Sequence, residues 1–142
     1  MSRGEMALRD IMVTELLTVF EDETMQRPAL FFKEFPFHHL PVLNRDVHLV
    51  GMLSSTDLAQ ISSGFSLFEM QDRAQYDDAI FQSTLVKDVM SKQIFSMHPQ
   101  QTIAEAYDQF RQGTFRAIPI VDGDQVVGLV TPLDIIEALL NS

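Results

Sequence analysis

The sequence predicts an α+β fold made of two copies of one βαββα-like unit. The first observation behind this prediction is a set of short motifs in residues 8–62 that recurs, in the same order, in residues 86–140. The second is that continuous apolar runs, typical of strands, alternate in each copy with segments of helical periodicity. A unit of about 55 residues is marginal as an independent fold. We therefore expect the copies to pack together through their sheets as a pseudo-twofold pair.

Motifs at a constant spacing define the repeat. The opening motif Arg9-Asp10-Ile11-Met12 returns as Lys87-Asp88-Val89-Met90, which is an offset of 78 residues (87 − 9). At the same offset, His39-Leu40-Pro41-Val42 matches Ala117-Ile118-Pro119-Ile120. Beyond the next turn the offset falls to 77 (128 − 51), so the second copy has lost one turn residue.

Each copy is expected to contain two strands joined by a turn. Residues 40–43 and 118–121 are continuous apolar runs, as expected for strands that are covered on both faces. The turn that follows contains Asn44-Arg45-Asp46 in the first copy and Asp122-Gly123-Asp124 in the second. Such residues favour tight turns because they tolerate unusual backbone angles or hydrogen-bond to nearby amides.

The first helix of the second copy is the clearest helical element. Thr102 and Glu105 have the spacing of a capping box, and Gly113 is well placed to end the helix. Four apolar or aromatic side chains share one predicted helical face: Ile103, Ala106, Tyr107 and Phe110. The equivalent helix of the first copy contains Pro28, which leaves its length open.

Residues 63–85 connect the copies and have no counterpart in the repeat. The repeat pattern ends at Ser62-Ser63-Gly64, and an apolar stretch precedes acidic, polar sequence. The apolar stretch contains Phe65, Leu67, Phe68 and Met70. One interpretation is a connector packed on the outside of the pair. The other is a segment that covers a cleft or mediates self-association, because its aromatic side chains would otherwise meet solvent.

Composition disfavours several classes of function. Twenty acidic residues against ten basic ones give a net charge of -10, which opposes binding to DNA, RNA or an anionic membrane. The chain has no cysteine for disulfides or thiolate metal sites, and its four histidines lack metal-ligand spacing. No apolar run approaches the ~20 residues of a membrane span, and no signal peptide or catalytic motif is visible. We expect a cytoplasmic protein that is not an enzyme.

The most informative motif is Gly-x-x-[Ser/Thr]-x-x-Asp, which occupies residues 51–57 and 128–134, where a strand is expected to lead into a helix. In a structural interpretation, Ser54 and Thr131 cap the helices, Pro132 opens one of them, and each motif aspartate is the third helical residue. A functional interpretation is equally open. Free amides at a helix start stabilise an anion, and a carboxylate can accept hydrogen bonds from two vicinal hydroxyls. A ribose phosphate presents both groups.

This ordered set of motifs resembles the CBS repeat, and its duplication resembles a CBS pair, also called a Bateman module. The likeness covers residues 8–62 and 86–140. It implies two symmetry-related clefts between the repeats, a homodimer, and binding of an adenosine-type nucleotide such as AMP, ADP, ATP or S-adenosylmethionine. It implies no catalysis and no obligatory cofactor.

By this resemblance, Asp57 and Asp134 would hold ribose hydroxyls, with Ser54 and Thr131 near the ribose or phosphate. Because clefts in the family draw on both repeats, the expected ligand-binding residues fall into two groups. The first group is Thr18, Phe37, His38, Thr131 and Asp134. The second group is Ser54, Asp57, Ser96, Phe115 and Arg116.

Further positions affect how strongly each cleft would bind. Arg116 lies three positions before Pro119, where the family often places a residue that reaches phosphate, and a guanidinium suits that role. The alternative is a solvated arginine at a strand edge. His38 has the equivalent place in the first repeat, and Phe37 beside it either stacks on a base or belongs to the core. Val13 stands where the family commonly has Ser or Thr, so one cleft is expected to be the weaker.

Two functions of different class are compatible with the sequence. The leading hypothesis is a ligand sensor, in which the nucleotide changes the arrangement of the two repeats and passes that change to a partner protein. The other is a ligand-independent dimerisation or interaction module, in which the motif aspartates only cap helices and the clefts are empty. A hydrolase acting on its nucleotide is a third hypothesis, and it predicts turnover. The sequence does not name the regulated partner.

Overall fold

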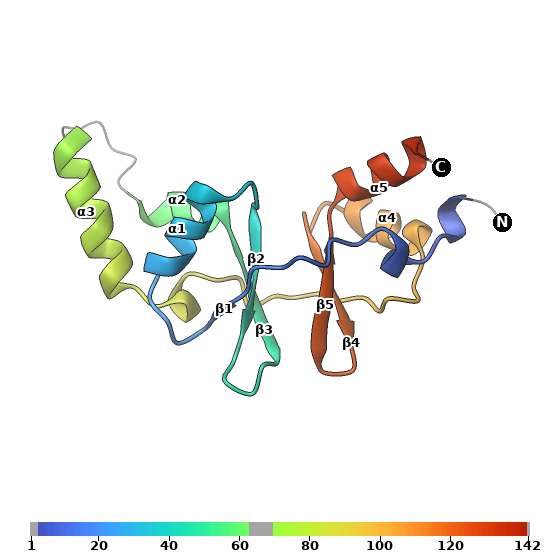
Figure 1. Cartoon of the computed structure of the whole chain (residues 1–142), viewed down its shortest axis with the longest axis horizontal. Helices are drawn as coiled ribbons and strands as arrows, with labels where there is room; N and C mark the ends of the chain where they lie inside the picture. The colour runs from blue at the N-terminus through green and yellow to red at the C-terminus, as the bar shows by residue number, and fades with distance from the viewer. Residues whose placement is uncertain (1–2, 63–69, 142) are drawn as a thin grey trace. The chain divides into compact units, whose positions relative to one another are not determined.

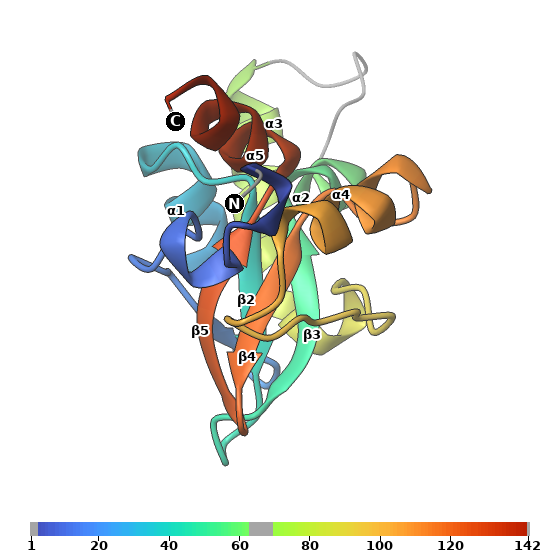
Figure 2. The ribbon, with the colours of Figure 1, turned by 90° about the vertical axis from the view of Figure 1, so that its right-hand side faces the viewer.

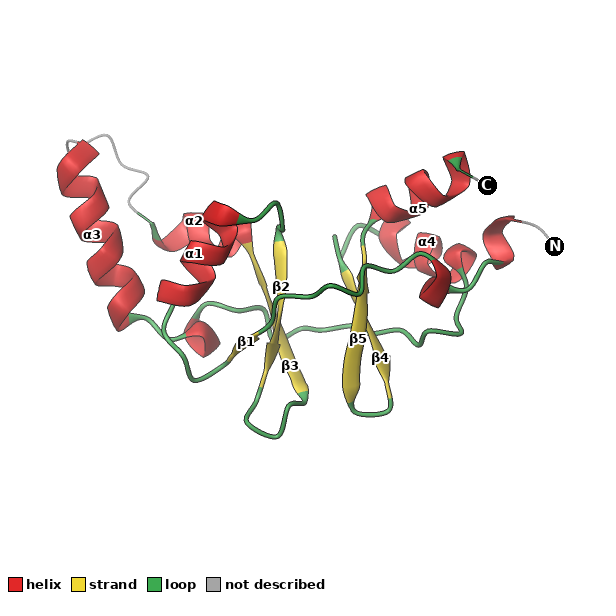
Figure 3. Cartoon of the chain, in the orientation of Figure 1, coloured by secondary structure: helices red, strands yellow, loops and turns green. Residues whose placement is uncertain are grey.

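The computed structural model describes residues 3–62 and 70–141, which form the helices and strands shown in Figure 1 and Figure 3. Up to residue 83, the longer elements are β1 (Val19–Phe20), α1 (Gln26–Glu34), β2 (His39–Leu43), β3 (Leu49–Ser54), α2 (Ser55–Ile61) and α3 (Met70–Ser83). The second half contains α4 (Ile103–Arg111), β4 (Ile118–Asp122), β5 (Gln125–Val130) and α5 (Pro132–Leu140). Single 3-10 turns occupy Arg3–Glu5, Leu8–Asp10 and Val86–Asp88. The predicted α+β class is confirmed, while Phe65, Leu67 and Phe68 of the connector lie outside the described residues.

The chain folds into two compact units whose boundaries differ from those of the repeats. Unit 1 consists of Met1–Leu16 together with Phe95–Ser142, and unit 2 consists of Leu17–Ile94. Unit 1 thus contains the opening segment of repeat 1 and most of repeat 2. Unit 2 contains most of repeat 1 and the opening segment of repeat 2.

Equivalent backbone hydrogen bonds hold the opening segment in both units. In unit 1, the Leu8 N–H donates to the Gln101 carbonyl at 2.8 Å. In unit 2, the Val86 N–H donates to the Glu23 carbonyl at 2.9 Å. Leu8 and Val86 are both 0% exposed. Because each segment satisfies its donors and buries its apolar side chain there, it is an integral part of the unit that receives it.

Each unit is built on an antiparallel hairpin with its helices on one face, α1 and α2 in unit 2 and α4 and α5 in unit 1 (Figure 1, Figure 2). In unit 2, β2 pairs with β3, and β1 adds a parallel strand in which Val19 lies opposite Val42. In unit 1, β4 pairs with β5, and a parallel bridge between Met97 and Ile120 takes the place of β1. The units therefore share one topology, with the third strand of unit 1 reduced to a single pair.

Each unit has its own apolar core. The buried residues of the unit 2 core are Val19, Met25, Leu40, Val42, Leu53, Val86 and Met90. Those of the unit 1 core are Leu8, Met97, Ile103, Ala106, Ile118, Ile120, Val130 and Ile135. Residues 40–43 are buried without interruption, as the sequence predicts, and so are residues 118–120. Val121, which the sequence predicts to be covered as well, is partly exposed.

Helix ends follow the capping chemistry of their sequences. The Glu105 N–H donates to the Thr102 hydroxyl (3.2 Å), and the Thr102 N–H donates to the Glu105 carboxylate (3.0 Å), so the predicted capping box of α4 is confirmed. Gly113 follows α4 with a φ of 81°, as expected for a helix end. Pro28 is accommodated because it lies in the first turn of α1, where the helix does not use the N–H. Tyr107 is 54% exposed, so the buried face of α4 is narrower than predicted.

The β2–β3 turn contains the extra residue of the first repeat. Val47 adopts a φ of 66°, which is unusual for a branched side chain. The Asn44 side-chain oxygen accepts hydrogen bonds from the Asp46 N–H (3.0 Å) and the His48 N–H (2.9 Å), and these bonds fix the turn. The shorter β4–β5 turn uses Gly123, with a φ of 62°.

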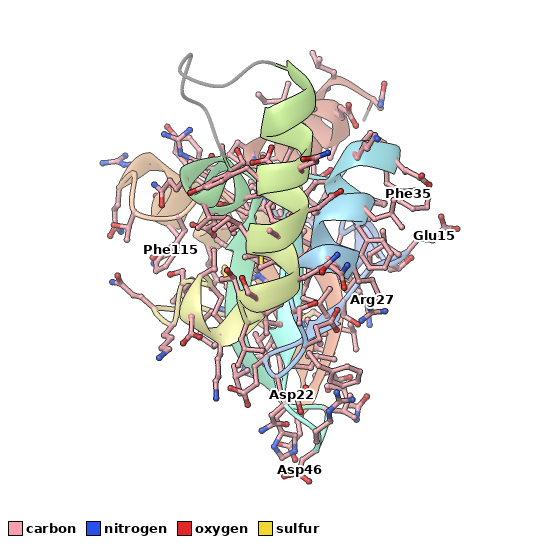
Figure 4. All side chains as sticks on the ribbon, turned by 90° about the vertical axis from the view of Figure 1, so that its left-hand side faces the viewer. Glu15, Asp22, Arg27, Phe35, Asp46 and Phe115 are labelled. Atoms are coloured by element: carbon pink, nitrogen blue, oxygen red, sulfur yellow. The ribbon has the colours of Figure 1, made fainter. Side chains whose placement is uncertain are left out.

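Arg45 ties the same turn to the end of β1. Its guanidinium forms a 2.7 Å ion pair with Asp22 and lies 4.1 Å from the centroid of the Phe20 ring. Asp22 accordingly lies near the turn that carries Asp46 (Figure 4). The hydrogen bond from Arg45 lowers the pKa of Asp22 below its ordinary value.

The described part of the connector, α3, lies against α1 on unit 2 (Figure 1, Figure 4). Near its end, the Phe81 carbonyl accepts a hydrogen bond from the Met25 N–H at 3.0 Å. The Phe81 side chain packs against the core of unit 2. This end of the connector is therefore fixed by both backbone and side-chain contacts.

Candidate ligand-binding sites

Both copies of the Gly-x-x-[Ser/Thr]-x-x-Asp motif form a sharp junction between a strand and a helix. Ser54 ends β3 in extended conformation (φ -110°, ψ 161°) and caps α2. Thr131 has nearly the same angles (φ -119°, ψ 165°) and caps α5. The Asp57 N–H donates to the Ser54 hydroxyl at 3.1 Å, and the Asp134 N–H donates to the Thr131 hydroxyl at 3.4 Å.

The motif aspartates complete the caps from the opposite direction. The Ser54 N–H donates to Asp57 Oδ2 at 2.8 Å, and the Thr131 N–H donates to Asp134 Oδ2 at the same distance. The Thr131 hydroxyl also donates to Asp134 Oδ2, at 3.1 Å. Both motifs are therefore reciprocal capping boxes, and the structural interpretation of the sequence is confirmed.

Capping occupies only one oxygen of each carboxylate. No residue within 3–62 and 70–141 donates a hydrogen bond to Oδ1 of Asp57 or Asp134. Both side chains are partly exposed. An ionised carboxylate has about four acceptor positions, so each aspartate can cap its helix and still accept hydrogen bonds from a ligand hydroxyl. The cap also fixes the direction in which the second oxygen points.

The two junctions differ at the first helical residue. In unit 2, the Ser55 N–H donates to the His38 carbonyl at 2.9 Å, which ties the start of α2 to the segment before β2. In unit 1 the equivalent residue is Pro132, which has no N–H and cannot make this bond to Arg116. The backbone at Arg116 is therefore less restrained than the backbone at His38.

The five residues of each predicted cleft group are divided between the two units. Unit 2 contains Thr18, Phe37, His38, Ser54 and Asp57. Unit 1 contains Ser96, Phe115, Arg116, Thr131 and Asp134. Within each unit the structure brings together the hydroxyl residue and the aspartate of the cap. The grouping of residues from different units stays a prediction.

The predicted aromatic residues already have aromatic partners within their own units. Phe115 stacks on Phe95, with centroids 5.7 Å apart and ring planes at 22°, and both pack against the core of unit 1. Phe37 lies 6.3 Å from the Phe35 ring at a tilt of 30°. Phe115 therefore serves the core whether or not it also contacts a ligand. Sequence reasoning did not assign Phe95, although its place beside Ser96 was a usable signal.

Arg116 and His38 are both exposed, as a residue that reaches for a ligand phosphate requires. Thr18 is partly buried, and its carbonyl accepts a hydrogen bond from Arg27 at 3.4 Å. Ser96 is exposed. Three of these four residues thus have exposed side chains, and Thr18 is partly buried.

A hollow of about 430 Å³ in unit 1 includes Asp134 in its wall. Its other lining residues are Met6, Asp10, Ile11, Glu137, Ala138 and Asn141. The wall contains carboxylates and no basic side chain, so it suits hydroxyl groups better than phosphate. Sequence reasoning did not assign Asp10 or Ile11 to a site, although both belong to the repeated opening motif.

Neither a metal cluster nor a membrane helix is found in the described part of the chain. No group of three or more His, Asp or Glu side chains there could hold a metal ion. Of the helices in residues 3–62 and 70–141, none combines the length and the apolar character needed to span a bilayer.

Comparison with known proteins identifies the fold. The chain is 31% identical over 124 residues to the CBS domain-containing protein YhcV of Bacillus subtilis, covering 87% of this chain and 79% of that protein. The CBS domain of a CBS domain-containing membrane protein from Sphaerobacter thermophilus aligns with a TM-score of 0.82 and 26% identity, over 99% of this chain and 91% of that chain.

Solved structures of two similar proteins contain adenosine compounds. One is CBSX2, a CBS-pair protein of Arabidopsis thaliana, in complex with AMP (TM-score 0.75, 20% identity, 95% of this chain and 96% of that chain). The other is the CBS domain pair of protein MJ0100 in complex with 5-methylthioadenosine and S-adenosyl-L-methionine (TM-score 0.72, 20% identity, 94% and 99%).

The CBS domain family itself matches this chain twice. The matched residues are 8–64 and 86–141, which include both opening motifs and both strand-helix junctions. The chain therefore belongs to the CBS domain family, with two CBS repeats in tandem.

Proposed function

We propose that the protein is a regulatory module that binds an adenosine-type nucleotide, such as AMP, ADP, ATP or S-adenosylmethionine, and catalyses no reaction. One observation carries the proposal. Asp57 and Asp134 are each held by a capping box, and each keeps a second carboxylate oxygen without a described protein donor. The complexes of CBSX2 with AMP and of the MJ0100 CBS pair with S-adenosyl-L-methionine support the ligand class.

The open oxygen of each aspartate is proposed to accept hydrogen bonds from the ribose hydroxyls. The hydroxyls of Ser54 and Thr131 lie beside these carboxylates and face the ribose or phosphate. Arg116 is proposed to contact phosphate, because a guanidinium binds two phosphate oxygens at once. Histidine is a weaker donor in its neutral form, so His38 is proposed to give the weaker phosphate contact.

Two clefts are proposed, each formed by residues of both repeats. One contains Thr18, Phe37, His38, Thr131 and Asp134. The other contains Ser54, Asp57, Ser96, Phe115 and Arg116. A ligand that bridges two repeats stabilises the arrangement in which both sets of contacts are made, and a partner protein that prefers this arrangement reads the signal.

Self-association is part of the proposal, as a cytoplasmic homodimer. Unit 1 exposes apolar and aromatic side chains on its two helices, namely Tyr107, Leu133, Ile136 and Leu140. The equivalent positions of α2 have Thr56 for Leu133 and Ala59 for Ile136. Ile136→Glu should shift the protein from dimer to monomer in analytical ultracentrifugation, while Ala59→Glu should not. A wild-type protein that sediments as a monomer would remove this part of the proposal.

Thermal unfolding with a ligand panel tests nucleotide binding. The panel is AMP, ADP, ATP, NAD, S-adenosylmethionine and cyclic dinucleotides, each near millimolar concentration. A ligand at about 100 times its dissociation constant adds about 2.7 kcal/mol, which raises the midpoint by several degrees. Asp57→Ala and Asp134→Ala should each reduce the ligand-induced rise and cost about 1 kcal/mol through loss of a cap.

Glu105→Ala is the matched control, because it breaks the capping box of α4, outside the motif. It should lower stability to a similar extent and leave the ligand-induced rise unchanged. If no compound raises the midpoint, the result supports the second candidate function, a ligand-independent interaction module. The complete capping boxes and the apolar side chains exposed on α4 and α5 favour this function. Release of product from the bound nucleotide would instead establish an enzyme.

A further inference from the structure

Each glycine of the Gly-x-x-[Ser/Thr]-x-x-Asp motif lies against a methionine from the opening motif of the other repeat. A Cβ added to Gly128 would meet the Met12 sulfur and lie 2.7 Å from Met12 Cγ. A Cβ added to Gly51 would meet the Met90 sulfur and lie 2.9 Å from the Ser91 carbonyl oxygen. Ordinary Cβ contacts are longer than this, so only glycine lets the methionine approach the strand so closely.

Backbone pairing reinforces both contacts. The Val13 N–H donates to the Leu129 carbonyl at 2.9 Å, and the Leu129 N–H donates back to the Val13 carbonyl at 3.0 Å. Ser91 and Met52 exchange the equivalent bonds at 2.9 and 3.0 Å. Only main-chain atoms take part, so the valine that replaces the family's Ser or Thr keeps this pairing intact.

These contacts come directly before the helix caps. Thr131 follows Leu129 by two residues, and Ser54 follows Met52 by two. A strand that shifts at the glycine therefore moves the cap and the open oxygen of its aspartate. The opening segment can resist such a shift because Leu8 anchors it in the core of unit 1 at 0% exposure.

We infer that Met12 and Met90 are positioning residues, each of which seats the strand that carries the capped aspartate of the other repeat. Met12, in repeat 1, sets the position of Asp134, and Met90, in repeat 2, sets the position of Asp57. Each contact lies within one unit: Met12 touches Gly128 in unit 1, and Met90 touches Gly51 in unit 2. The consequence is reciprocal control: a change in the opening segment of one repeat alters the site at the other repeat's aspartate. The effect on ligand affinity rests on the proposed function, whereas the effect on the cap does not.

Amide hydrogen exchange on the ligand-free protein tests the effect on the cap. Met12→Ala should speed exchange at Thr131 and Asp134 about tenfold and leave Ser54 and Asp57 unchanged, because the lost contact opens only one junction. Met90→Ala should give the opposite pattern. Met97→Ala is the control, since Met97 is a buried methionine in the core of unit 1 and belongs to neither opening motif. It should not accelerate the Asp134 cap selectively.

Ligand affinity is measured by calorimetry with AMP in proteins that keep one motif aspartate. In an Asp57→Ala background, Met12→Ala should weaken binding about three- to tenfold and Met90→Ala less than twofold. In an Asp134→Ala background the order should reverse. Gly128→Ala should also weaken the Asp134 site, and Gly128→Ala combined with Met12→Ala should recover part of the loss, because the smaller side chain leaves room for the new methyl group.

The outcomes separate the two levels of the inference. Equal acceleration of both caps by Met12→Ala, or acceleration of the Ser54 cap alone, would overturn the positioning role. A selective exchange effect with no AMP binding by wild-type protein would retain the positioning role and refute the proposed function. A third outcome is that each methionine variant speeds hydrogen exchange at one cap only but weakens AMP binding equally at both sites. The two methionines would then only hold the strands in place, and the claim of reciprocal control would be overturned.

Discussion

Unit 1 and unit 2 agree around their motif aspartates and differ on their helices and turns. Both have a capping box at the strand-helix junction, a methionine seated on a glycine, and the same hydrogen bond from the opening segment. Two stretches of largely different sequence thus reproduce one set of contacts. These contacts are what the fold of the unit requires, and the differences mark what is specific to each copy.

One difference lies at the start of the first helix. In unit 1, the capping box of Thr102 and Glu105 satisfies the Thr102 and Glu105 amides at the start of α4. In unit 2, α1 starts after Met25 without a side-chain cap, and Arg27, at the position equivalent to Glu105, forms a 2.7 Å ion pair with Glu23. A surface ion pair contributes less than a cap and is screened by salt. The Gln26 N–H also donates to the Thr24 hydroxyl at 3.4 Å, so the two helix starts are held by different groups.

The largest expected loss of stability concerns the opening segments, each of which packs in the unit that contains most of the other repeat. Leu8→Ala removes a fully buried side chain from the core of unit 1, although Leu8 belongs to repeat 1. It should cost about 3 kcal/mol, as buried Leu→Ala changes typically do. Hydrogen exchange should accelerate at Ile118 and Val130 of unit 1 more than at Leu40 and Leu53 of unit 2. The reverse order would mean that each repeat keeps its own opening segment in solution.

Val86→Ala is the matched variant for the other unit. Val86 is equally buried, in the core of unit 2. The loss of stability should be smaller, because Val→Ala removes one carbon fewer than Leu→Ala. Hydrogen exchange should accelerate at Leu40 and Leu53 of unit 2 more than at Ile118 and Val130 of unit 1. Urea unfolding measures the free energy of unfolding of each variant, and hydrogen exchange shows which unit loses the stability.

The sequence could not have predicted that each opening segment packs with the other repeat, and the reason is the repetition itself. The opening motifs of the two copies are similar, and so are the segments that receive them, Gln101 in one unit and Glu23 in the other. Backbone amides and carbonyls make the bonds, so no side chain distinguishes a segment packed on its own repeat from one packed on the other. Chain order favours the first, and only the three-dimensional structure shows the second.

Local features, in contrast, could be predicted. The capping boxes at Ser54, Thr102 and Thr131 follow from residues three positions apart, and the buried strands follow from continuous apolar runs. Both signals depend on neighbours in sequence. The exposure of Tyr107 could not be predicted, because helical spacing gives the face of a residue and not the width of the surface that covers it.

A second, smaller effect is expected from exchanging the residues that open α2 and α5. Ser55→Pro removes the hydrogen bond to the His38 carbonyl but keeps a residue suited to the first helical position, and Ser54 already has the extended backbone that precedes proline. We expect a loss of about 0.5–1 kcal/mol and faster exchange around His38. Pro132→Ser should slow exchange at Phe115 and Arg116 by supplying the missing donor. No change in either variant would show that this bond does not restrain the segment.

The two hairpin turns should respond in opposite directions to exchange of their residues with positive φ. Val47→Gly relieves a branched side chain at φ 66°, and we expect a gain of about 0.5 kcal/mol, because the lower strain exceeds the added freedom of the unfolded chain. Gly123→Ala should cost about 1 kcal/mol. Nothing lies within 4 Å of its added Cβ, so that cost is backbone strain alone. Thermal midpoints of the two variants measure the difference, and a stabilising Gly123→Ala would contradict this account.

The smallest effect on stability is expected at Asp22. Its partner Arg45 lies in the β2–β3 turn, which is longer than the equivalent β4–β5 turn of unit 1. Hydrogen bonding by Arg45 lowers the pKa of Asp22 in the folded protein. A depressed pKa means that the pair stabilises the fold above the pKa of the unfolded chain, and that this stabilisation is lost as the pH falls through the folded pKa. Relative to Asp22→Asn, wild-type protein should therefore lose a small increment of stability below about pH 4. The increment should shrink in high salt because both groups are exposed, and parallel pH profiles for the two proteins would show that the ion pair does not contribute.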